Sequence, residues 1–105
     1  MVKHVNQEEL EVLIRENKYV VADFWATWCG PCRMLAPVLD SLSEKYADKA
    51  VFVKVDVDDN EEAARKYGIS SIPNVFVIEN GKVKDNNLGF VPEASMEAFL
   101  NKNLV

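Results

Sequence analysis

Two cysteines separated by two residues carry the clearest chemical signal in this sequence. Cys29 and Cys32 enclose Gly30 and Pro31, and at the start of a helix this spacing can give the ~4.4–6.8 Å Cα separation of a disulfide. The positive end of the helix favours a thiolate at the first cysteine, and the thiolate is the species that attacks disulfides. The second cysteine can then resolve the mixed disulfide within the same molecule. The pair therefore predicts reversible thiol–disulfide exchange, with Cys29 as nucleophile and Cys32 as resolving thiol.

Two other interpretations of the pair remain open on spacing alone. Half a zinc site would need two more ligands, and His4 is the only other nitrogen or sulfur donor of the usual kind. A purely structural disulfide would close a very short loop and so remove little entropy from the unfolded chain. Redox chemistry is the interpretation that the residues favour.

The elements on either side of the pair explain how it is positioned. Residues 19–26 form a nearly continuous apolar, β-branched and aromatic run, which is typical of a strand buried on both faces. Apolar side chains then recur at helical spacing from Met34 to Tyr46. Cys29 is therefore expected where a buried strand ends and a helix begins.

The remaining elements predict an α/β fold with one mixed sheet and helices on both of its faces. Periodicity, capping residues and turn residues predict, in chain order, a strand at 2–5, a helix opened by a capping box of Asn6 and Glu9, the strand at 19–26, the helix after Cys29, a strand at 51–57, a helix at 61–67 capped by Asn60 and ended by Gly68, a hairpin of 75–79 and 82–84 around Asn80 and Gly81, and a last helix opened by Pro92. No linker or repeat interrupts the chain, so we expect a single domain over residues 1–105.

Composition narrows the class of protein. Of the 105 residues, 49% are apolar and 28% are charged, which is typical of a globular domain and not of a disordered chain. A net charge of −5 argues against binding to nucleic acid, which requires a basic patch. The sequence contains no apolar run of the ~20 residues that a membrane helix needs, and no basic and apolar signal peptide is visible at its start. We therefore expect an acidic, soluble, cytoplasmic protein.

Residues 23–33, with the sequence Asp-Phe-Trp-Ala-Thr-Trp-Cys-Gly-Pro-Cys-Arg, resemble the active-site segment of the thioredoxin family. Further matches occur in the family's order along essentially the whole chain: Pro37, residues 54–58, 67–69 and 71–73, Asn80 with Gly81, and Gly89. The resemblance implies the thioredoxin fold and a protein-disulfide reductase that carries electrons through Cys29 and Cys32. It implies no bound cofactor and no metal.

The resemblance also implies partners. Thioredoxin reductase would supply the electrons, and the clients would be disulfide-containing proteins such as ribonucleotide reductase, peroxiredoxins or methionine sulfoxide reductase. The protein would act as a monomer. Two rival functions stay open: net oxidation or isomerisation of disulfides, against which Gly30 and Pro31 and the missing signal sequence count, and a binding module in which the cysteines are incidental.

Two charged residues interrupt apolar strands next to the pair. Asp23 lies amid Val21, Ala22, Phe24 and Trp25, so burial should raise the pKa of its carboxyl, as a proton acceptor near neutral pH requires. Alternatively, its face is solvated at a sheet end. The resemblance implies a buried acid that helps to deprotonate Cys32.

Lys54 is the second charged residue in an apolar strand. It is either a snorkelling or edge lysine or, as the resemblance implies, a cation that tunes Asp23.

The resemblance further implies a docking surface, a shallow apolar groove for an extended client segment beside the cysteines. Its residues would be Trp28, Gly30, Pro31, Ile72, Pro73, Leu88, Gly89 and Phe90. The sequence does not reveal the isomer of the Ile72–Pro73 bond, which is cis in the family. Trp28 could instead belong to the core, and Gly89 could be an ordinary turn residue.

Three residues near this surface depart from the usual family pattern. Asn74 replaces the usual threonine, Arg33 replaces the frequent lysine, and Phe90 is bulkier than the common small residue. These departures concern the choice of partner and not the redox chemistry.

Overall fold

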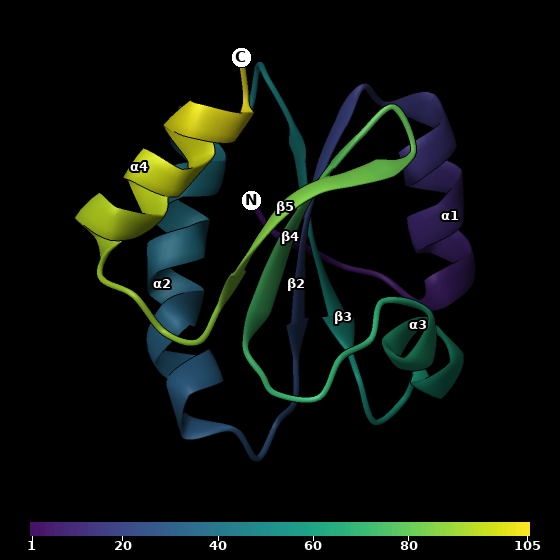
Figure 1. Cartoon of the computed structure of the whole chain (residues 1–105). Coiled ribbons are helices and arrows are strands. Elements are labelled where there is room, and N and C mark those ends of the chain that lie inside the picture. The colour runs from purple at the N-terminus through teal and green to yellow at the C-terminus, as the bar shows by residue number, and fades with distance from the viewer.

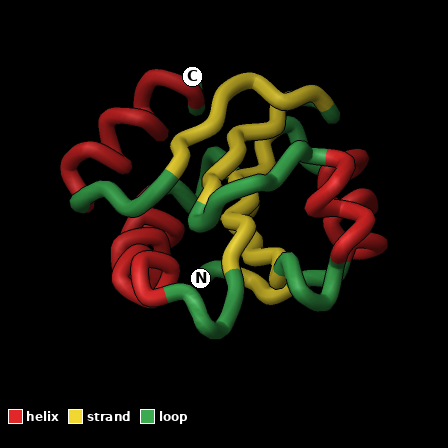
Figure 2. Tube along the Cα trace, turned by 60° about the horizontal axis from the view of Figure 1, so that its bottom comes forward, coloured by secondary structure: helices red, strands yellow, loops and turns green.

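The computed structural model describes all 105 residues as one five-stranded sheet with two helices on each face (Figure 1; Figure 2). In chain order the elements are β1 (Lys3–His4), α1 (Gln7–Glu16), β2 (Tyr19–Trp25), α2 (Gly30–Lys45), β3 (Val51–Asp56), α3 (Glu61–Lys66), β4 (Asn74–Glu79), β5 (Lys82–Leu88) and α4 (Glu93–Asn103). The strand order is β1-β3-β2-β4-β5. β1, β3 and β2 run parallel, whereas β4 and β5 are antiparallel to their neighbours. The predicted α/β class and the mixed sheet are therefore confirmed.

Strand β2 lies in the centre of the sheet and is buried on both faces, as the apolar run predicted. On one face Val21 packs in a core with side chains of α2 and α4, such as Leu39 and Leu100. On the other face Phe24 packs in a second core with α1 and α3, including Leu10. Complete burial of each such side chain contributes about 1.5–3 kcal/mol, so β2 is held by packing on both of its faces.

Local sequence signals account for several element boundaries. The Asn6 side chain accepts a hydrogen bond from the Glu9 N–H, and the Glu9 carboxylate accepts one from the Asn6 N–H, both at 2.8 Å. This is the predicted capping box. Asn80 and Gly81 have φ values of 50° and 83°, the left-handed conformations that a type I′ hairpin turn requires.

Asn60 is the N-cap residue of α3, as predicted, but its side chain does not cap that helix. Asn60 makes no side-chain hydrogen bond to its own helix; its Oδ1 instead accepts from the Gln7 N–H at the start of α1, at 2.9 Å. The Gln7 side chain in turn accepts from the Ala63 N–H of α3, at 3.0 Å. The two helices therefore cap each other, and this exchange joins residues more than 50 positions apart in the chain.

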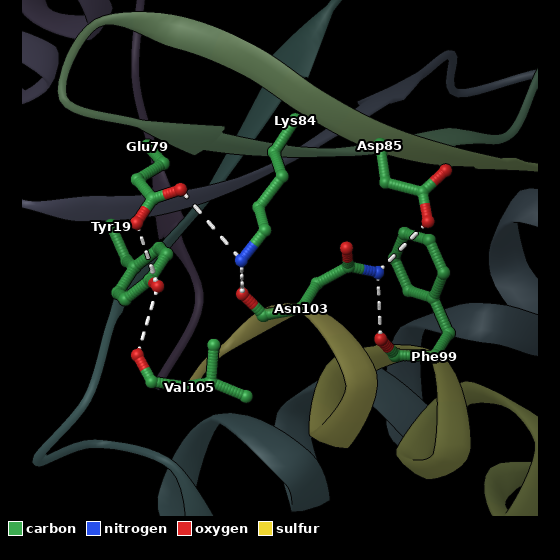
Figure 3. Close-up of polar contacts among 7 residues, drawn as sticks. All are labelled: Tyr19, Glu79, Lys84, Asp85, Phe99, Asn103 and Val105. Carbon is green, nitrogen blue, oxygen red and sulfur yellow. Dashed lines mark hydrogen bonds and ion pairs between the residues drawn. The ribbon is translucent and has the colours of Figure 1, made fainter.

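The end of α4 is fixed to the sheet by a group of polar side chains, the terminal polar network (Figure 3). Asn103 is buried, and its Nδ2 donates to Asp85 Oδ2 and to the Phe99 carbonyl, each at 2.9 Å. Lys84 donates to the Asn103 carbonyl at 2.7 Å. The network therefore ties α4 to β5.

Tyr19, the first residue of β2, completes the terminal polar network. Its hydroxyl lies 2.9 Å from both Glu79 Oε2 and the Val105 carbonyl oxygen. Glu79 also lies 3.7 Å from Lys84 Nζ. The last residue of the chain is thereby joined to the amino end of the central strand.

None of the helices is long and apolar enough to cross a lipid bilayer.

Candidate active site

The cysteine pair lies at the junction of β2 and α2, at the lower end of the molecule in Figure 1. Cys29 is the N-cap residue of α2, and Cys32 lies in the first turn of that helix. The two residues are joined by a disulfide, with a Cα separation of 5.2 Å. Pro31 also lies in the first turn, where its missing N–H costs no helical hydrogen bond. The structure therefore places the pair where a buried strand ends and a helix begins, as the sequence predicted.

The backbone at the start of α2 is directed at the first sulfur. Cys29 Sγ accepts a hydrogen bond from the Cys32 N–H at 3.2 Å, so the sulfur takes the place of the oxygen of an ordinary N-cap residue. In the reduced protein the same N–H and the positive end of the helix favour a thiolate at Cys29. Both cysteines are nearly inaccessible in the disulfide form, with Cys29 4% and Cys32 1% exposed.

Trp28 projects into solvent immediately before the pair. Its side chain is 67% exposed, so the alternative that Trp28 belongs to the core is wrong. The indole Nε1 donates to Asp58 Oδ2 at 2.8 Å, which fixes the ring next to Cys29. Sequence reasoning did not identify Asp58 as a site residue, because it lies 30 positions away and no local pattern connects it with Trp28.

Asp23, on the strand that leads to the pair, is buried without a hydrogen-bond partner. It is 1% exposed, and neither carboxylate oxygen has a hydrogen-bond partner. Burial raises the pKa of Asp23 to about 7, and the positive charge of Lys54 offsets part of this rise. The alternative of a solvated Asp23 at a sheet end is therefore wrong.

Lys54 lies beside Asp23 in the strand register of β2 and β3. Because β3 lies between β1 and β2, Lys54 is not on an edge strand. The side chain is half-buried, and its Nζ rests 4.3 Å from the centroid of the Trp25 ring. The ammonium is thereby kept inside the site, where it acts on Asp23 through its charge.

The loop before β4 approaches the cysteines. The Ile72–Pro73 bond is cis, and the Ile72 carbonyl oxygen lies 3.9 Å from Cys29 Sγ. Ile72 also packs against Ala26 and the two cysteines, while the Pro73 side chain is buried. Of this pair, therefore, Ile72 offers side-chain surface at the site.

A second loop, after β5, joins the first. The Gly89 N–H donates to the Pro73 carbonyl at 2.7 Å, and Gly89 has a φ of 88°, which a residue with a side chain rarely adopts. On either side of Gly89, Leu88 is 57% and Phe90 37% exposed. Gly89 is thus more than an ordinary turn residue, because its backbone ties the two loops together.

Two of the three departures from the family pattern have partners within the chain. Asn74 is buried, and its Oδ1 accepts from Asn86 Nδ2 at 3.0 Å. Arg33 donates to the Thr27 carbonyl at 3.0 Å. Asn86, like Asp58, was not identified from the sequence, because its partner lies on the neighbouring strand.

Comparisons with known proteins agree over nearly the entire chain. The model of the Thioredoxin family matches residues 1–102. A thioredoxin of Bacillus subtilis (strain 168) is 49% identical over 85 residues, which cover 81% of this chain and 82% of that protein. A thioredoxin of Haemophilus influenzae is 39% identical over 104 residues, covering 98% and 97% of the two chains. A solved structure of Plasmodium falciparum thioredoxin superposes with a TM-score of 0.90 at 39% identity, covering 96% of this chain and 98% of that one.

Proposed function

The chain belongs to the thioredoxin family, and from this premise we propose a role for each residue of its site. Family membership confirms the predicted fold, and it makes the protein a thiol–disulfide oxidoreductase that reduces protein disulfides through Cys29 and Cys32. The observation that carries the proposed roles is the position of Cys29 Sγ at the start of α2, facing the Cys32 N–H.

In the proposed reaction Cys29 is the nucleophile. Its thiolate attacks one sulfur of a client disulfide, so that a bond forms between Cys29 and the client and the other client sulfur leaves as a thiolate. Cys32, once deprotonated, attacks the Cys29 sulfur and releases the second client sulfur. Two electrons pass to the client, and this protein is left with the Cys29–Cys32 disulfide.

Asp23 is the proposed proton acceptor for Cys32. A pKa of about 7 lets the carboxyl gain and lose a proton near neutral pH. No other hydrogen bond competes for its oxygens. Lys54 favours the charged form of Asp23 and so tunes that exchange.

The docking surface is proposed to bind an extended segment of the client across the cysteines. Its exposed apolar side chains are Trp28, Leu88 and Phe90. Ile72, which packs against the two cysteines, is partly exposed. Gly30 and Pro31 add the backbone between the cysteines, and Pro73 and Gly89 hold the two loops in place. Apolar side chains around a reactive sulfur suit clients whose disulfides lie in locally unfolded or extended segments.

Partners follow from the family at a general level: a reductase supplies electrons, and disulfide-containing proteins receive them. More specifically, we propose thioredoxin reductase as the donor and ribonucleotide reductase, peroxiredoxins or methionine sulfoxide reductase as clients. We further propose that residues 1–105 act as a single domain and a monomer in the cytoplasm.

The assignment of the two cysteines has a direct test. Cys32→Ser should accumulate a stable mixed disulfide with a client protein, because Cys29 still attacks but nothing resolves the product. Cys29→Ser should form none. Mass spectrometry after rapid acid quenching measures both. A mixed disulfide formed mainly by the Cys29→Ser variant, or faster alkylation of Cys32 than of Cys29 in the reduced protein, would falsify the assignment.

A further inference from the structure

The strand register aligns three titratable side chains across the sheet. His4 of β1 pairs with Lys54 of β3, and Lys54 pairs with Asp23 of β2. Side chains at paired positions share a face of the sheet. Two residues earlier in each segment, Val2, Phe52 and Val21 lie together in the core with side chains of α2 and α4. The row of His4, Lys54 and Asp23 therefore lies on the face that α2 covers.

Exposure to solvent changes along this row. Asp23 is buried, Lys54 is half-buried and His4 is exposed. Trp25, which lies two residues after Asp23, is contacted by the other two residues of the row, His4 and Lys54. The His4 ring lies edge-on to the indole, with 5.6 Å between the centroids, and Lys54 Nζ lies 4.3 Å from the same centroid. The indole is thus held between the histidine and the ammonium.

Charged side chains of both signs line the two pockets beside His4, and Lys3 lines one of them. Besides Lys54, the pocket on this side of His4 is lined by Asp56 of β3 and Asp59 of the following segment. Glu9 of α1 lines a second pocket on the other side of His4. Those carboxylates could attract the Lys54 ammonium away from Asp23 and toward solvent. The contact with the Trp25 ring opposes that movement.

We propose that His4 is a positioning residue for the buried acid: its ring fixes the Trp25 indole, and the indole holds the Lys54 ammonium beside Asp23. This inference rests on the proposed role of Asp23 as proton acceptor, and it adds a residue at the sheet edge to that machinery. Without the His4 ring, the indole gains freedom to turn and Lys54 moves toward Asp56 and Asp59. Asp23 then loses the charge that favours its ionised form, so its carboxyl holds its proton to higher pH.

Three variants separate packing from charge. His4→Ala removes the ring, and His4→Phe keeps a ring while removing any charge. Lys3→Gln is the matched control, because Lys3 is exposed next to His4 and its side chain points to the opposite face. The midpoint of the Asp23 titration is measured in each oxidised variant by carboxyl ¹³C NMR. No client is present, so the result does not depend on whether Asp23 serves Cys32.

His4→Ala is expected to raise the midpoint by about 1 pH unit, because a neighbouring cation lowers a carboxyl pKa by about 1–3 units. His4→Phe should change it by at most about 0.3 unit, the effect of one charge two strand spacings (~10 Å) away in a water-like dielectric. Lys3→Gln should leave it in place. In a Lys54→Met background, His4→Ala should have no further effect, since the ammonium that His4 positions is gone.

Equal midpoints for wild type and His4→Ala would overturn the proposal. So would a His4→Phe shift as large as that of His4→Ala, or a full His4→Ala shift in the Lys54→Met background. Failure of the Asp23 role itself would appear elsewhere, as an unchanged rate of mixed-disulfide resolution in Asp23→Ala. The two hypotheses therefore fail in different measurements.

Discussion

The two ends of strand β2 differ in whether the carboxylates near them have hydrogen-bond partners. At the amino end, both side-chain carboxylates of the terminal polar network have a hydrogen-bond donor. Glu79 accepts from the Tyr19 hydroxyl, and Asp85 accepts from the Asn103 amide. At the carboxyl end, Asp23 is buried with no hydrogen bond at all. A buried polar group without a partner destabilises a fold, whereas a paired one contributes modest stability.

The pKa values of two aspartates express this difference. Burial raises the pKa of Asp23 to about 7. The hydrogen bond from Asn103 lowers the pKa of Asp85, with a further contribution from the nearby Lys102. Folding therefore favours the proton on Asp23 and removes it from Asp85. The end of β2 next to the cysteine pair thus contains a group that destabilises the fold, whereas the polar groups at the other end stabilise it.

Replacement of Asp23 should give the largest change in stability. Since its folded pKa lies above the value of 3.8 for an ordinary aspartate, the unfolded state loses the proton first as pH rises. The native state then binds more protons, so the free energy of unfolding falls from about pH 4 to about pH 7 and then levels off. At about 1.4 kcal/mol per unit, the loss approaches roughly 4 kcal/mol.

Asp23→Ala should therefore be more stable than wild type at pH 8, and the gain should shrink toward pH 4. Denaturant melts of the oxidised proteins at both values measure it. Asp48→Ala, a change at an exposed aspartate, is the control and should show no such dependence. A gap between Asp23→Ala and wild type that is the same at both pH values would contradict the buried, protonated acid.

The same variant should slow the chemistry. Without Asp23, Cys32 lacks the proton acceptor that we propose for it, and loss of a positioned general base costs about 10²-fold or more in rate. We expect slower release of the client from a preformed mixed disulfide at pH 7. Acid quenching at successive times and chromatography measure the rate of this release. A variant that is both more stable and as fast as wild type would show that the unpaired carboxylate has no role in resolution.

Sequence reasoning succeeded where the interaction is local. The capping box of Asn6 and Glu9, the turn at Asn80 and Gly81 and the cysteine pair at a helix start each depend on residues within a few positions. Asp23 could be predicted as buried because its strand neighbours are apolar on both sides.

Sequence reasoning failed where the interacting residue is distant in the chain. The Asn60 side chain accepts a hydrogen bond from α1 instead of from its own helix, and Asp58 orients Trp28 across 30 positions. Neither pairing has a local pattern, because strand order and loop geometry bring the residues together. The register of His4 with Lys54 is of the same kind, since it depends on β1 pairing with β3.

Asn103 provides the next test, at the other end of β2. Asn103→Leu keeps the number and branching of the side-chain heavy atoms but removes both donated hydrogen bonds, and it leaves the Phe99 carbonyl and the Asp85 carboxylate without the amide. Loss of bonds to a buried or charged acceptor costs about 1–3 kcal/mol. We expect destabilisation by about 2 kcal/mol in denaturant melts at pH 7. The redox equilibrium with glutathione should not move, and a shift would mean that the two ends are coupled.

Tyr19→Phe should give the smallest effect and defines the lower limit of the comparison. The variant keeps the ring, which is buried, and removes only the hydroxyl that bridges Glu79 and the Val105 carbonyl. The hydroxyl has one proton and donates to only one of these acceptors at a time, and Glu79 keeps Lys84 nearby. One hydrogen bond is therefore lost, and the cost should be about 1 kcal/mol.

Tyr67→Phe is the matched control, because the Tyr67 hydroxyl donates no hydrogen bond to another residue and its ring packs against Phe24 and Phe76. Its melt should coincide with that of wild type within error. If Tyr67→Phe is as destabilising as Tyr19→Phe, the loss reflects the aromatic ring environment and not the network. A cost confined to Tyr19→Phe, with an unchanged rate of client reduction, would show that the amino end of β2 stabilises the fold independently of the site at its other end.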